Sequence, residues 1–259
     1  MSINFNKKKV LVIGLGETGQ SALHFLANKE CDIQAIDTRP IIDNFDAIKE
    51  KFKDVKFTIG KKFNDTIIHD VELIIISPGM SLKESYVQKA LNQGIPVIGD
   101  IEMFAQVKSV SSKVIGITGS NGKTTVTALV GDLLKAAGIS IGIPILNTLN
   151  QKVPEVYVLE LSSYQLESTY SLALETAAIL NISEDHMDRY GSMEEYAKAK
   201  YRIFNHAKNI ILNREDDYLK SQINESSLTF GTHLDEKNYG IKKNGNQYFI
   251  AKGSAEIIS

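Results

Sequence analysis

Short apolar runs alternate with stretches of helical spacing from the start of the chain. Lys9–Ile13 (KVLVI) is a continuous apolar run of strand length, and Thr18–Asn28 carries apolar residues at helical spacing. Asp32–Asp37 is predicted as the next strand. Strand, helix and strand together form a β-α-β unit, whose two strands run parallel because a crossover helix joins them.

The same alternation continues and predicts two tandem α/β domains with parallel sheets. We expect the first domain to span residues 1–99 and the second residues 100–259. Further strands are predicted at Leu73–Ser77, Ile95–Ile98, Val114–Thr118, Val156–Leu159, Ala177–Leu180, Ile210–Leu212, Leu228–Phe230, Tyr239–Lys242 and Gln247–Ala251. Further helices are predicted at Ser85–Gln93, Thr124–Ala137 and Met193–Ala207, with Asn244–Asn246 as the turn of a hairpin.

Composition narrows the class of protein. The chain has 259 residues, of which 43% are apolar and 23% charged, as in a globular protein large enough for a proper core. The formal net charge of −2 gives no reason to expect nucleic acid or a membrane as partner. The single cysteine, Cys31, excludes an intrachain disulfide. Met1–Lys9 is polar and no apolar run reaches ~18 residues, so we expect a cytoplasmic protein without a signal peptide.

The strongest motif is a phosphate loop between a predicted strand and a predicted helix. Its residues are Gly119, Ser120, Asn121, Gly122, Lys123, Thr124 and Thr125. Glycines let the backbone curl so that successive N–H groups face phosphate oxygens. Lys123 supplies a cation, and the Thr124 hydroxyl can bind Mg²⁺. Ile117 stands where the longer form of the motif has glycine, so the match is to the shorter T-G-x-x-G-K-T form. The second domain is therefore predicted to bind a nucleoside triphosphate.

A second glycine-rich loop, Gly14–Gly19 (GLGETG), follows the first strand, and Asp37 ends the next one. This is the arrangement of a Rossmann-like domain, in which the acidic residue binds a ribose hydroxyl of a dinucleotide. The motif does not select the ligand, because a uridine nucleotide can use the same loop and the same acid. A tight turn without any ligand is a further alternative.

Polar residues that follow later strands suggest a metal site. Glu160 ends one predicted strand. His186 follows another, between Asp185 and Asp188. Carboxylates at such strand ends suit Mg²⁺, which prefers oxygen ligands. A helix N-cap for Glu160 and a structural role for His186 remain alternatives. Lys200, taken alone, is interpreted as part of a solvated helix face.

Four segments together resemble the Mur ligases of peptidoglycan synthesis. They are Gly119–Thr125, Leu159–Glu167 (LELSSYQLE), Asn181–Tyr190 (NISEDHMDRY) and Ala199–Phe204 (AKYRIF). Within that family the second and third segments are similar to those of the members that add D-glutamate. The resemblance implies a monomeric, ATP-dependent ligase that acts through an acyl phosphate. Its partners would be UDP-N-acetylmuramoyl-L-alanine, ATP and D-glutamate.

The resemblance also assigns roles to individual residues. The UDP group would lie on Gly14, Leu15, Gly16, Glu17, Thr18, Asp37, Thr38, Arg39, Ser77, Pro78 and Gly79, with Ser162 and Gln165. The phosphate loop would bind ATP, Thr124 and Glu160 would bind one Mg²⁺, and His186 a second Mg²⁺. Lys200 would carry a carbamate that helps to hold the second metal. Lys123, His186 and Lys200 would be the catalytic residues.

Two departures from the family pattern lead to further expectations. The family has a third domain that binds D-glutamate, and the chain ends at Ser259 before such a domain. We therefore expect these residues to bind nucleotide substrates without completing ligation. The stretch Gly138–Leu146 is shorter than in the family, where a Gly-Gly-Asn run precedes the Ile-Gly-x-Pro of this stretch; a real deletion and an unobserved loop both explain the difference. An NAD(P)-dependent oxidoreductase that uses Gly14–Gly19 and Asp37 is the alternative from another class.

Overall fold

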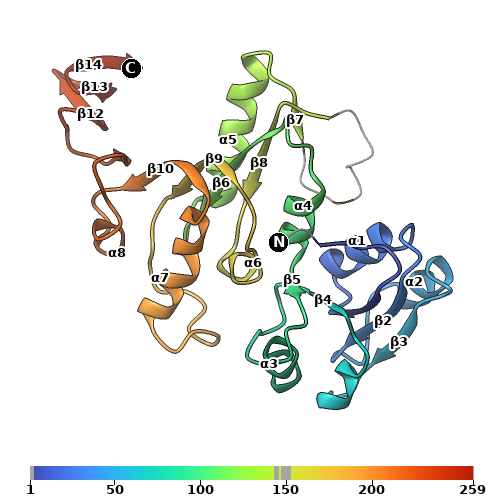
Figure 1. The fold of residues 1–259 in the computed structure, drawn as a ribbon. Coiled ribbons are helices and arrows are strands. Elements are labelled where there is room, and N and C mark those ends of the chain that lie inside the picture. The colour runs from blue at the N-terminus through green and yellow to red at the C-terminus, as the bar shows by residue number, and fades with distance from the viewer. Residues whose placement is uncertain (1–2, 143–145, 147–152, 259) are drawn as a thin grey trace. The chain divides into compact units, whose positions relative to one another are not determined.

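The computed structural model describes residues 3–142, 146 and 153–258. The chain divides into two compact units (Figure 1). Unit 1 is built from Met1–Val110 together with Tyr164–Leu172, and unit 2 from Ser111–Gly142, Pro154–Ser163 and Ala173–Ser259. The domain boundary expected between residues 99 and 100 stays a prediction.

Unit 1 contains a five-stranded parallel sheet in the order β3-β2-β1-β4-β5. Its strands are β1 (Lys9–Ile13), β2 (Asp32–Asp37), β3 (Lys56–Ile59), β4 (Leu73–Ile76) and β5 (Val97–Ile98). Its helices are α1 (Glu17–Leu26), α2 (Phe45–Lys51), η1 (Asp65–Ile68), α3 (Ser85–Asn92) and α4 (Asp100–Val107). Leu11, Ile36 and Ile74 from the strands pack with Val87 of α3 in a buried core. All five strands therefore present their carboxyl ends at one edge, where β1, β2 and β4 are neighbours.

A buried carboxylate on α4 explains why residues 164–172 belong to unit 1. Glu102 is 2% exposed and accepts hydrogen bonds from the N–H groups of Tyr170 (2.7 Å) and Ser171 (2.8 Å). It also accepts from the Ser171 hydroxyl (2.6 Å) and from Gln106 Nε2 (2.8 Å). A buried charge is stable only when it is paired or fully hydrogen-bonded, as Glu102 is here. The segment that includes α6 (Ser163–Glu167) is thus fixed to α4.

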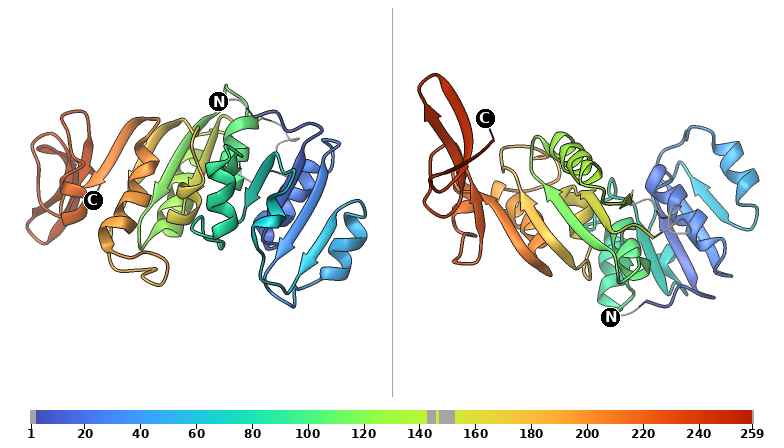
Figure 2. Two further views of the ribbon diagram at one scale, coloured as in Figure 1. Left: turned by 60° about the horizontal axis from the view of Figure 1, so that its bottom comes forward. Right: turned by 90° about the horizontal axis from the view of Figure 1, so that it is seen from above.

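Unit 2 contains a nine-stranded sheet in the order β14-β13-β12-β11-β10-β9-β6-β8-β7, shown from two further sides in Figure 2. Its strands are β6 (Lys113–Thr118), β7 (Ile141–Gly142), β8 (Val156–Glu160), β9 (Leu174–Ile179), β10 (Ala207–Asn213), β11 (Leu228–Phe230), β12 (Tyr239–Asn244), β13 (Gln247–Lys252) and β14 (Ala255–Ile258). Its further helices are α5 (Lys123–Ala136), α7 (Met193–Tyr201), η3 (Arg202–Phe204) and α8 (Asp217–Lys220). In sheet order, all neighbouring strands from β7 through β8, β6, β9, β10 and β11 to β12 are parallel. The pairs β12–β13 and β13–β14 are antiparallel. Val126, Val130 and Leu134 of α5 pack on Ile117 and Val158 of the sheet.

Most of the predicted elements are confirmed, and the misses have physical reasons. The helix predicted at Met193–Ala207 is wrong in its second half, because α7 ends at Tyr201 and Ala207 begins β10. Pairing of Ala207 with Leu174 of β9 overrides the helical spacing there. Strand β3 was not predicted because its residues are at most partly buried, and β14 because all four are exposed.

Two further expectations from the sequence concern membrane-spanning helices and the stretch Gly138–Leu146. No helix in the ranges 3–142 and 153–258 combines the length and apolarity needed to cross a membrane. The shortened stretch Gly138–Leu146 includes residues 143–145, which lie outside the described residues.

Candidate functional site

The first glycine-rich loop joins β1 to α1 in unit 1. Gly14 has φ +90°, a conformation that side chains rarely adopt. A Cβ on Gly19 would collide with Gly14 O, so α1 can lie this close to the strand only with glycine at that position. The two glycines therefore hold the end of β1 and the start of α1 in a tight turn at the carboxyl edge of the sheet.

Asp37, at the end of β2, is the electrostatic centre of this loop. Its carboxylate is 3% exposed and accepts the Leu15 N–H (2.8 Å) and the Arg39 N–H (2.9 Å). Arg39 also donates from Nε (2.9 Å) and Nη2 (2.7 Å). Burial by itself raises the pKa of Asp37, but the hydrogen bonds from Arg39 and Leu15 outweigh it and hold that pKa below its usual value. Asp37 is thus an anion that fixes the loop backbone.

A cavity of about 590 Å³ opens beside this loop. Its lining contains ten of the residues predicted for the UDP group, namely Gly14, Gly16, Glu17, Thr18, Asp37, Thr38, Arg39, Ser77, Pro78 and Gly79. Leu15 is buried instead of lining the cavity, and neither Ser162 nor Gln165 is among its lining residues. Met80 lines it without having been predicted; its position directly after Pro78–Gly79 is the only sequence signal for it.

Asp100, which no sequence motif marked, connects this cavity to Gln165. The Asp100 carboxylate accepts hydrogen bonds from the Thr18 side chain and from Gln165 Nε2 (3.4 Å). Burial raises the pKa of Asp100, and these hydrogen bonds only partly oppose that effect. Gln165 therefore lies one hydrogen-bonded residue away from a cavity-lining side chain.

The phosphate loop joins β6 to α5 in unit 2. Gly122 has φ +80° and stands directly before the first helical residue, Lys123. Lys123 Nζ donates to Gly119 O and to Ser120 O, both at 2.9 Å. The lysine thus folds back over its own loop and places its charge beside the start of the helix. That start attracts anions through its unpaired N–H groups.

Lys200 meets the same loop from α7, which corrects its interpretation as a solvated side chain. It is 1% exposed, its Nζ donates to Gly119 O (2.9 Å), and Nζ lies 4.6 Å from the centre of the Tyr196 ring. Burial, together with the nearby charge of Lys123, lowers the pKa of Lys200 to about 7, against the opposing effect of Asp185. Two lysine amines therefore converge on one carbonyl of the phosphate loop.

The predicted metal ligands are only partly gathered. Glu160 ends β8 and pairs in register with Ile117 of β6, the strand that leads into the phosphate loop. His186 has φ +57°, and its Nε2 lies 3.3 Å from Asp185 Oδ2. Among the described residues, no group of three or more His, Cys, Asp and Glu side chains could hold a metal ion. Mg²⁺ in nucleotide sites commonly uses one or two carboxylates with substrate phosphates and water, so Thr124 and Glu160 suit such a site.

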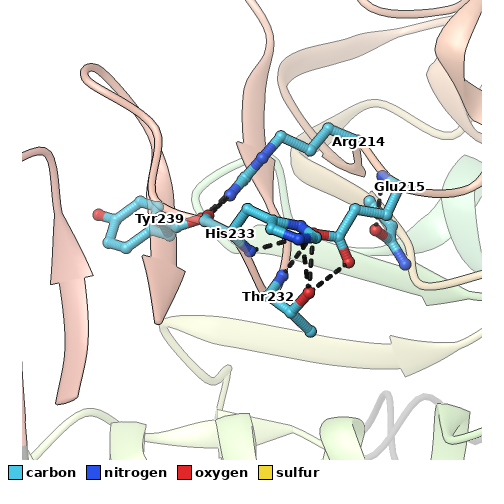
Figure 3. Close-up of polar contacts among 6 residues, drawn as sticks. Arg214, Glu215, Thr232, His233 and Tyr239 are labelled. Carbon is cyan, nitrogen blue, oxygen red and sulfur yellow. Dashed lines mark hydrogen bonds and ion pairs between the residues drawn. The ribbon is translucent and has the colours of Figure 1, made fainter. Parts of the chain in front are cut away.

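A separate polar cluster lies where β10 and β11 end (Figure 3). Glu215 accepts from the N–H groups of Thr232 (2.7 Å) and His233 (3.1 Å), and its Oε1 lies 2.7 Å from His233 Nδ1. Arg214 donates to Tyr239 O (2.6 Å) and to His233 O. These contacts join the end of β10 to the segment between β11 and β12. The cluster therefore fixes the strands that follow the phosphate-loop part of the sheet.

Comparison with known proteins fits this geometry. Residues 117–257, more than half of the chain, match the Mur ligase middle domain, and residues 8–99 match the Mur ligase MurD-like N-terminal domain. The chain belongs to the Mur ligase family. The family resemblance deduced from the four sequence segments is thereby confirmed, whereas the oxidoreductase alternative finds no support.

Several Mur ligases are similar to this chain along almost its whole length. A UDP-N-acetylmuramoylalanine--D-glutamate ligase of Methylobacillus flagellatus is 42% identical over 99% of this chain and 58% of its own length. The ligase of the same name from Pasteurella multocida is 43% identical over 97% of this chain and 58% of its own. The chain thus spans little more than half the length of these relatives.

Solved Mur ligase structures share the fold. A ligase from Neisseria meningitides that acts on UDP-N-acetylmuramate and L-alanyl-gamma-D-glutamyl-meso-diaminopimelate superposes with a TM-score of 0.60 at 16% identity, covering 96% of this chain and 86% of its own. The UDP-N-acetylmuramate-alanine ligase of Thermotoga maritima gives 0.52 at 20% identity, covering 97% and 59%. At these identities the likeness concerns the α/β fold alone.

Proposed function

We propose that this chain supplies the nucleotide-sugar site and the ATP site of a ligase that adds D-glutamate to UDP-N-acetylmuramoyl-L-alanine. Relatives that carry this name are 41–43% identical to this chain over 96% or more of its length. Because the chain spans 58% of their length, the activity is proposed for the whole protein.

Unit 1 is proposed as a Rossmann-like domain that binds the UDP group. The strand order β3-β2-β1-β4-β5 and the glycine-rich turn after β1 support this proposal. The cavity beside Asp37 offers an anionic acceptor for hydroxyl or N–H groups of a nucleoside, with Arg39 next to it as a cation. Gln165 joins the site indirectly through Asp100 and Thr18. The role of Ser162 remains a prediction.

Unit 2 is proposed as the P-loop ATPase domain. The observation that carries the proposal is the convergence of Lys123 and Lys200 on Gly119 O, beside the start of α5. Lys123, held at this helix start, provides positive charge that a triphosphate requires, and Lys200 is held at the same carbonyl. Thr124 and Glu160 are proposed to hold one Mg²⁺, and His186 with Lys200 a second, which would neutralise phosphate charge when bound.

The reaction proposed for these sites has two steps. A carboxylate oxygen of UDP-N-acetylmuramoyl-L-alanine attacks the γ-phosphorus of ATP, and the bond to the bridging oxygen of ADP breaks. The amine of D-glutamate then attacks the acyl carbon, and phosphate leaves from the tetrahedral intermediate. The chain contributes binding and charge: Lys123 is proposed to bind the phosphates, and unit 1 the UDP group of the substrate.

Lys200 is proposed to carry a carbamate in the active protein. A neutral amine attacks CO₂, the new N–C bond forms, and the released proton leaves an anionic carbamate. Its nitrogen retains one N–H, so the bond that Nζ donates to Gly119 O can persist. Burial beside the phosphate loop gives this group a fixed place facing the site.

The direct test uses the full-length protein with UDP-N-acetylmuramoyl-L-alanine, D-glutamate, Mg²⁺ and ATP. We expect release of one phosphate for each product formed, measured by coupled phosphate assay and mass spectrometry. Equal rates with L-glutamate, or product formation without ATP, would refute the proposal. Binding of NADH but of no UDP-sugar would instead favour the oxidoreductase.

One of the remaining expectations follows from the proposed reaction. ATP and a UDP-activated substrate imply a cytoplasmic location. A monomeric state, the absence of a nucleic-acid partner, and the inability of these 259 residues alone to complete ligation stay predictions.

A further inference from the structure

The front half of the phosphate loop is hydrogen-bonded to the neighbouring strand end. Strands β6 and β9 pair as far as Thr118 and Ile179, and the Leu180 N–H donates to Thr118 O (2.9 Å). The ladder continues beyond both strands, because the Ser120 N–H donates to Asn181 O (2.9 Å). The loop thus begins as an extension of the parallel sheet, at the edge where β6 and β9 lie side by side in Figures 1 and 2.

Asn181 extends the ladder by one more step with its side chain. Its Oδ1 accepts the Asn121 N–H (2.9 Å), and its Nδ2 donates to Asn121 O (3.1 Å). A side-chain amide has an acceptor and donors in one plane, so it can take the place of a peptide group in the ladder. Aspartate would lose the donor and serine the second contact. The amide of asparagine is therefore matched to both main-chain groups of Asn121.

Ser183, two residues after Asn181, contacts the same part of the loop. Ser183 N–H donates to Ser120 Oγ (2.9 Å), which lies 3.0 Å from Ser183 O and donates to it. Asn121 Nδ2 donates to Ser183 Oγ (3.2 Å). Residues 181–183 thus hold Ser120 and Asn121 through both main-chain and side-chain atoms.

The second half of the loop, Gly122–Thr125, differs because its N–H groups have no partner within the helix that follows. The first helical hydrogen bond of α5 runs from the Val126 N–H to Gly122 O (3.0 Å). The N–H groups of Gly122, Lys123, Thr124 and Thr125 precede that bond and have no partner within the helix. These are the donors that a helix start offers to a phosphate.

We propose that Asn181 is a positioning residue of the phosphate loop. Its side-chain amide fixes Ser120 and Asn121 before a nucleotide arrives, and the phosphates are bound by the N–H groups of Gly122–Thr125. This inference rests on the proposed ATP site. It also revises the expectation that Ser120 and Asn121 bind ATP, because their N–H groups are already used within the chain.

Amide hydrogen exchange, resolved by NMR, tests the arrangement with and without ADP. In the ligand-free full-length protein, the N–H groups of Ser120 and Asn121 should be protected, and those of Gly122–Thr125 should exchange faster. ADP should protect the second group and leave the first unchanged. Equal exchange of all six without ligand would overturn the proposal. Protection of Ser120 and Asn121 only after ADP is added would overturn it as well.

Two variants test the amide of Asn181 by ADP titration calorimetry. Asn181→Ala and Asn181→Asp should each weaken ADP binding about tenfold, as loss of loop-ordering hydrogen bonds predicts. Affinity for UDP-N-acetylmuramoyl-L-alanine should not change. Unchanged ADP affinity in the folded Asp variant would overturn the proposal.

Asn209→Ala is the matched control, because Asn209 Nδ2 also donates to a main-chain oxygen of β9, Glu175 O (2.7 Å). This contact lies away from the phosphate loop, so ADP affinity should stay at the wild-type value. A tenfold loss in this variant too would show that general weakening of the sheet causes the effect and would refute a positioning role. If the wild-type protein binds no ADP, the proposed ATP site fails, whereas ligand-free exchange still decides whether Asn181 holds the loop.

Discussion

The two glycine-rich loops have the same local topology and opposite charge. Each follows a parallel strand and opens a helix, and each contains a glycine with positive φ, Gly14 in one and Gly122 in the other. In unit 1 the loop N–H of Leu15 is bound to a buried carboxylate, Asp37. In unit 2 the loop carbonyl of Gly119 is bound to two lysines.

This difference separates what the fold provides from what the side chains decide. Parallel strands place loop and helix start at the carboxyl edge in both units. The charged side chain beside each loop sets the sign of the local charge: Asp37 from the end of β2 in unit 1, and Lys123 from the start of α5 in unit 2. The carboxylate of Asp37 is suited to hydroxyl or N–H donors of a ligand, whereas the charge of Lys123 is suited to phosphate. The first three variants below each remove a charge beside one of the loops, and the fourth removes a carboxylate outside both.

The largest effect is expected from Lys123→Ala in the full-length protein. Because Lys123 supplies a cation at the phosphate loop, ATP turnover should fall by roughly 10²–10³-fold. Binding of the UDP-substrate, measured by calorimetry, should be unchanged. Lys135→Ala serves as control, since Lys135 lies on the same helix and pairs with Asp132 at the surface. Turnover at the wild-type rate in Lys123→Ala would show that the loop does not act on phosphate.

Lys200→Ala should give the next largest loss, roughly 10- to 100-fold in kcat, if a carbamate there supports a metal site. Adding acetate or formate should restore part of the activity, because a small carboxylate can occupy the vacated place. Lys198→Ala, on the exposed face of the same helix, should neither lose activity nor respond to acetate. Loss of activity without any rescue would leave Lys200 a structural cation and contradict the carbamate.

The elements and residues of the two units differ in how far the sequence alone predicts them. Strands β1, β2 and β11 were predicted to the residue, and in β1 a continuous apolar run marks a strand that is buried from Val10 to Ile13. Ten cavity-lining residues were named from the glycine-rich motif and the family resemblance, whereas Met80 was not. Lys200 was not recognised as buried from spacing alone, since packing against the phosphate loop, 81 residues away, decides its environment. The Asn181 ladder depends on the same long-range approach of two strand ends.

Asp37→Asn should produce an intermediate effect that is confined to unit 1. Affinity for the UDP-substrate should fall about tenfold, because the neutral amide weakens the hydrogen bonds from Arg39 and Leu15. ADP affinity should stay unchanged.

The same variant tests the charge of Asp37 through the pH dependence of stability. Because the pKa of Asp37 is lowered in the folded protein, its stabilising effect is complete above pH ~4 and is lost as pH falls through the lower folded pKa. The difference in Tm between variant and wild type should therefore narrow below about pH 4. A constant difference down to pH 2 would contradict this assignment.

The smallest effect is expected from Glu215→Gln, which tests a carboxylate outside both loops that is hydrogen-bonded by Thr232 and His233. The side-chain hydrogen bond from His233, followed by the N–H groups of His233 and Thr232, lowers the pKa of Glu215 to about 2 (Figure 3). An ionised Glu215 therefore stabilises the fold above pH ~4.3, and this contribution disappears as pH falls towards 2. Glu215→Gln should lower Tm slightly at neutral pH and not at pH 2, with ADP and UDP-substrate affinities unchanged. Glu225→Gln, an exposed residue of the same stretch, should leave Tm unchanged at both pH values. If Glu215→Gln instead weakened ADP binding as Lys123→Ala is expected to, the cluster after β10 would belong to the nucleotide site, and charge at the two loops alone would no longer account for what each unit binds.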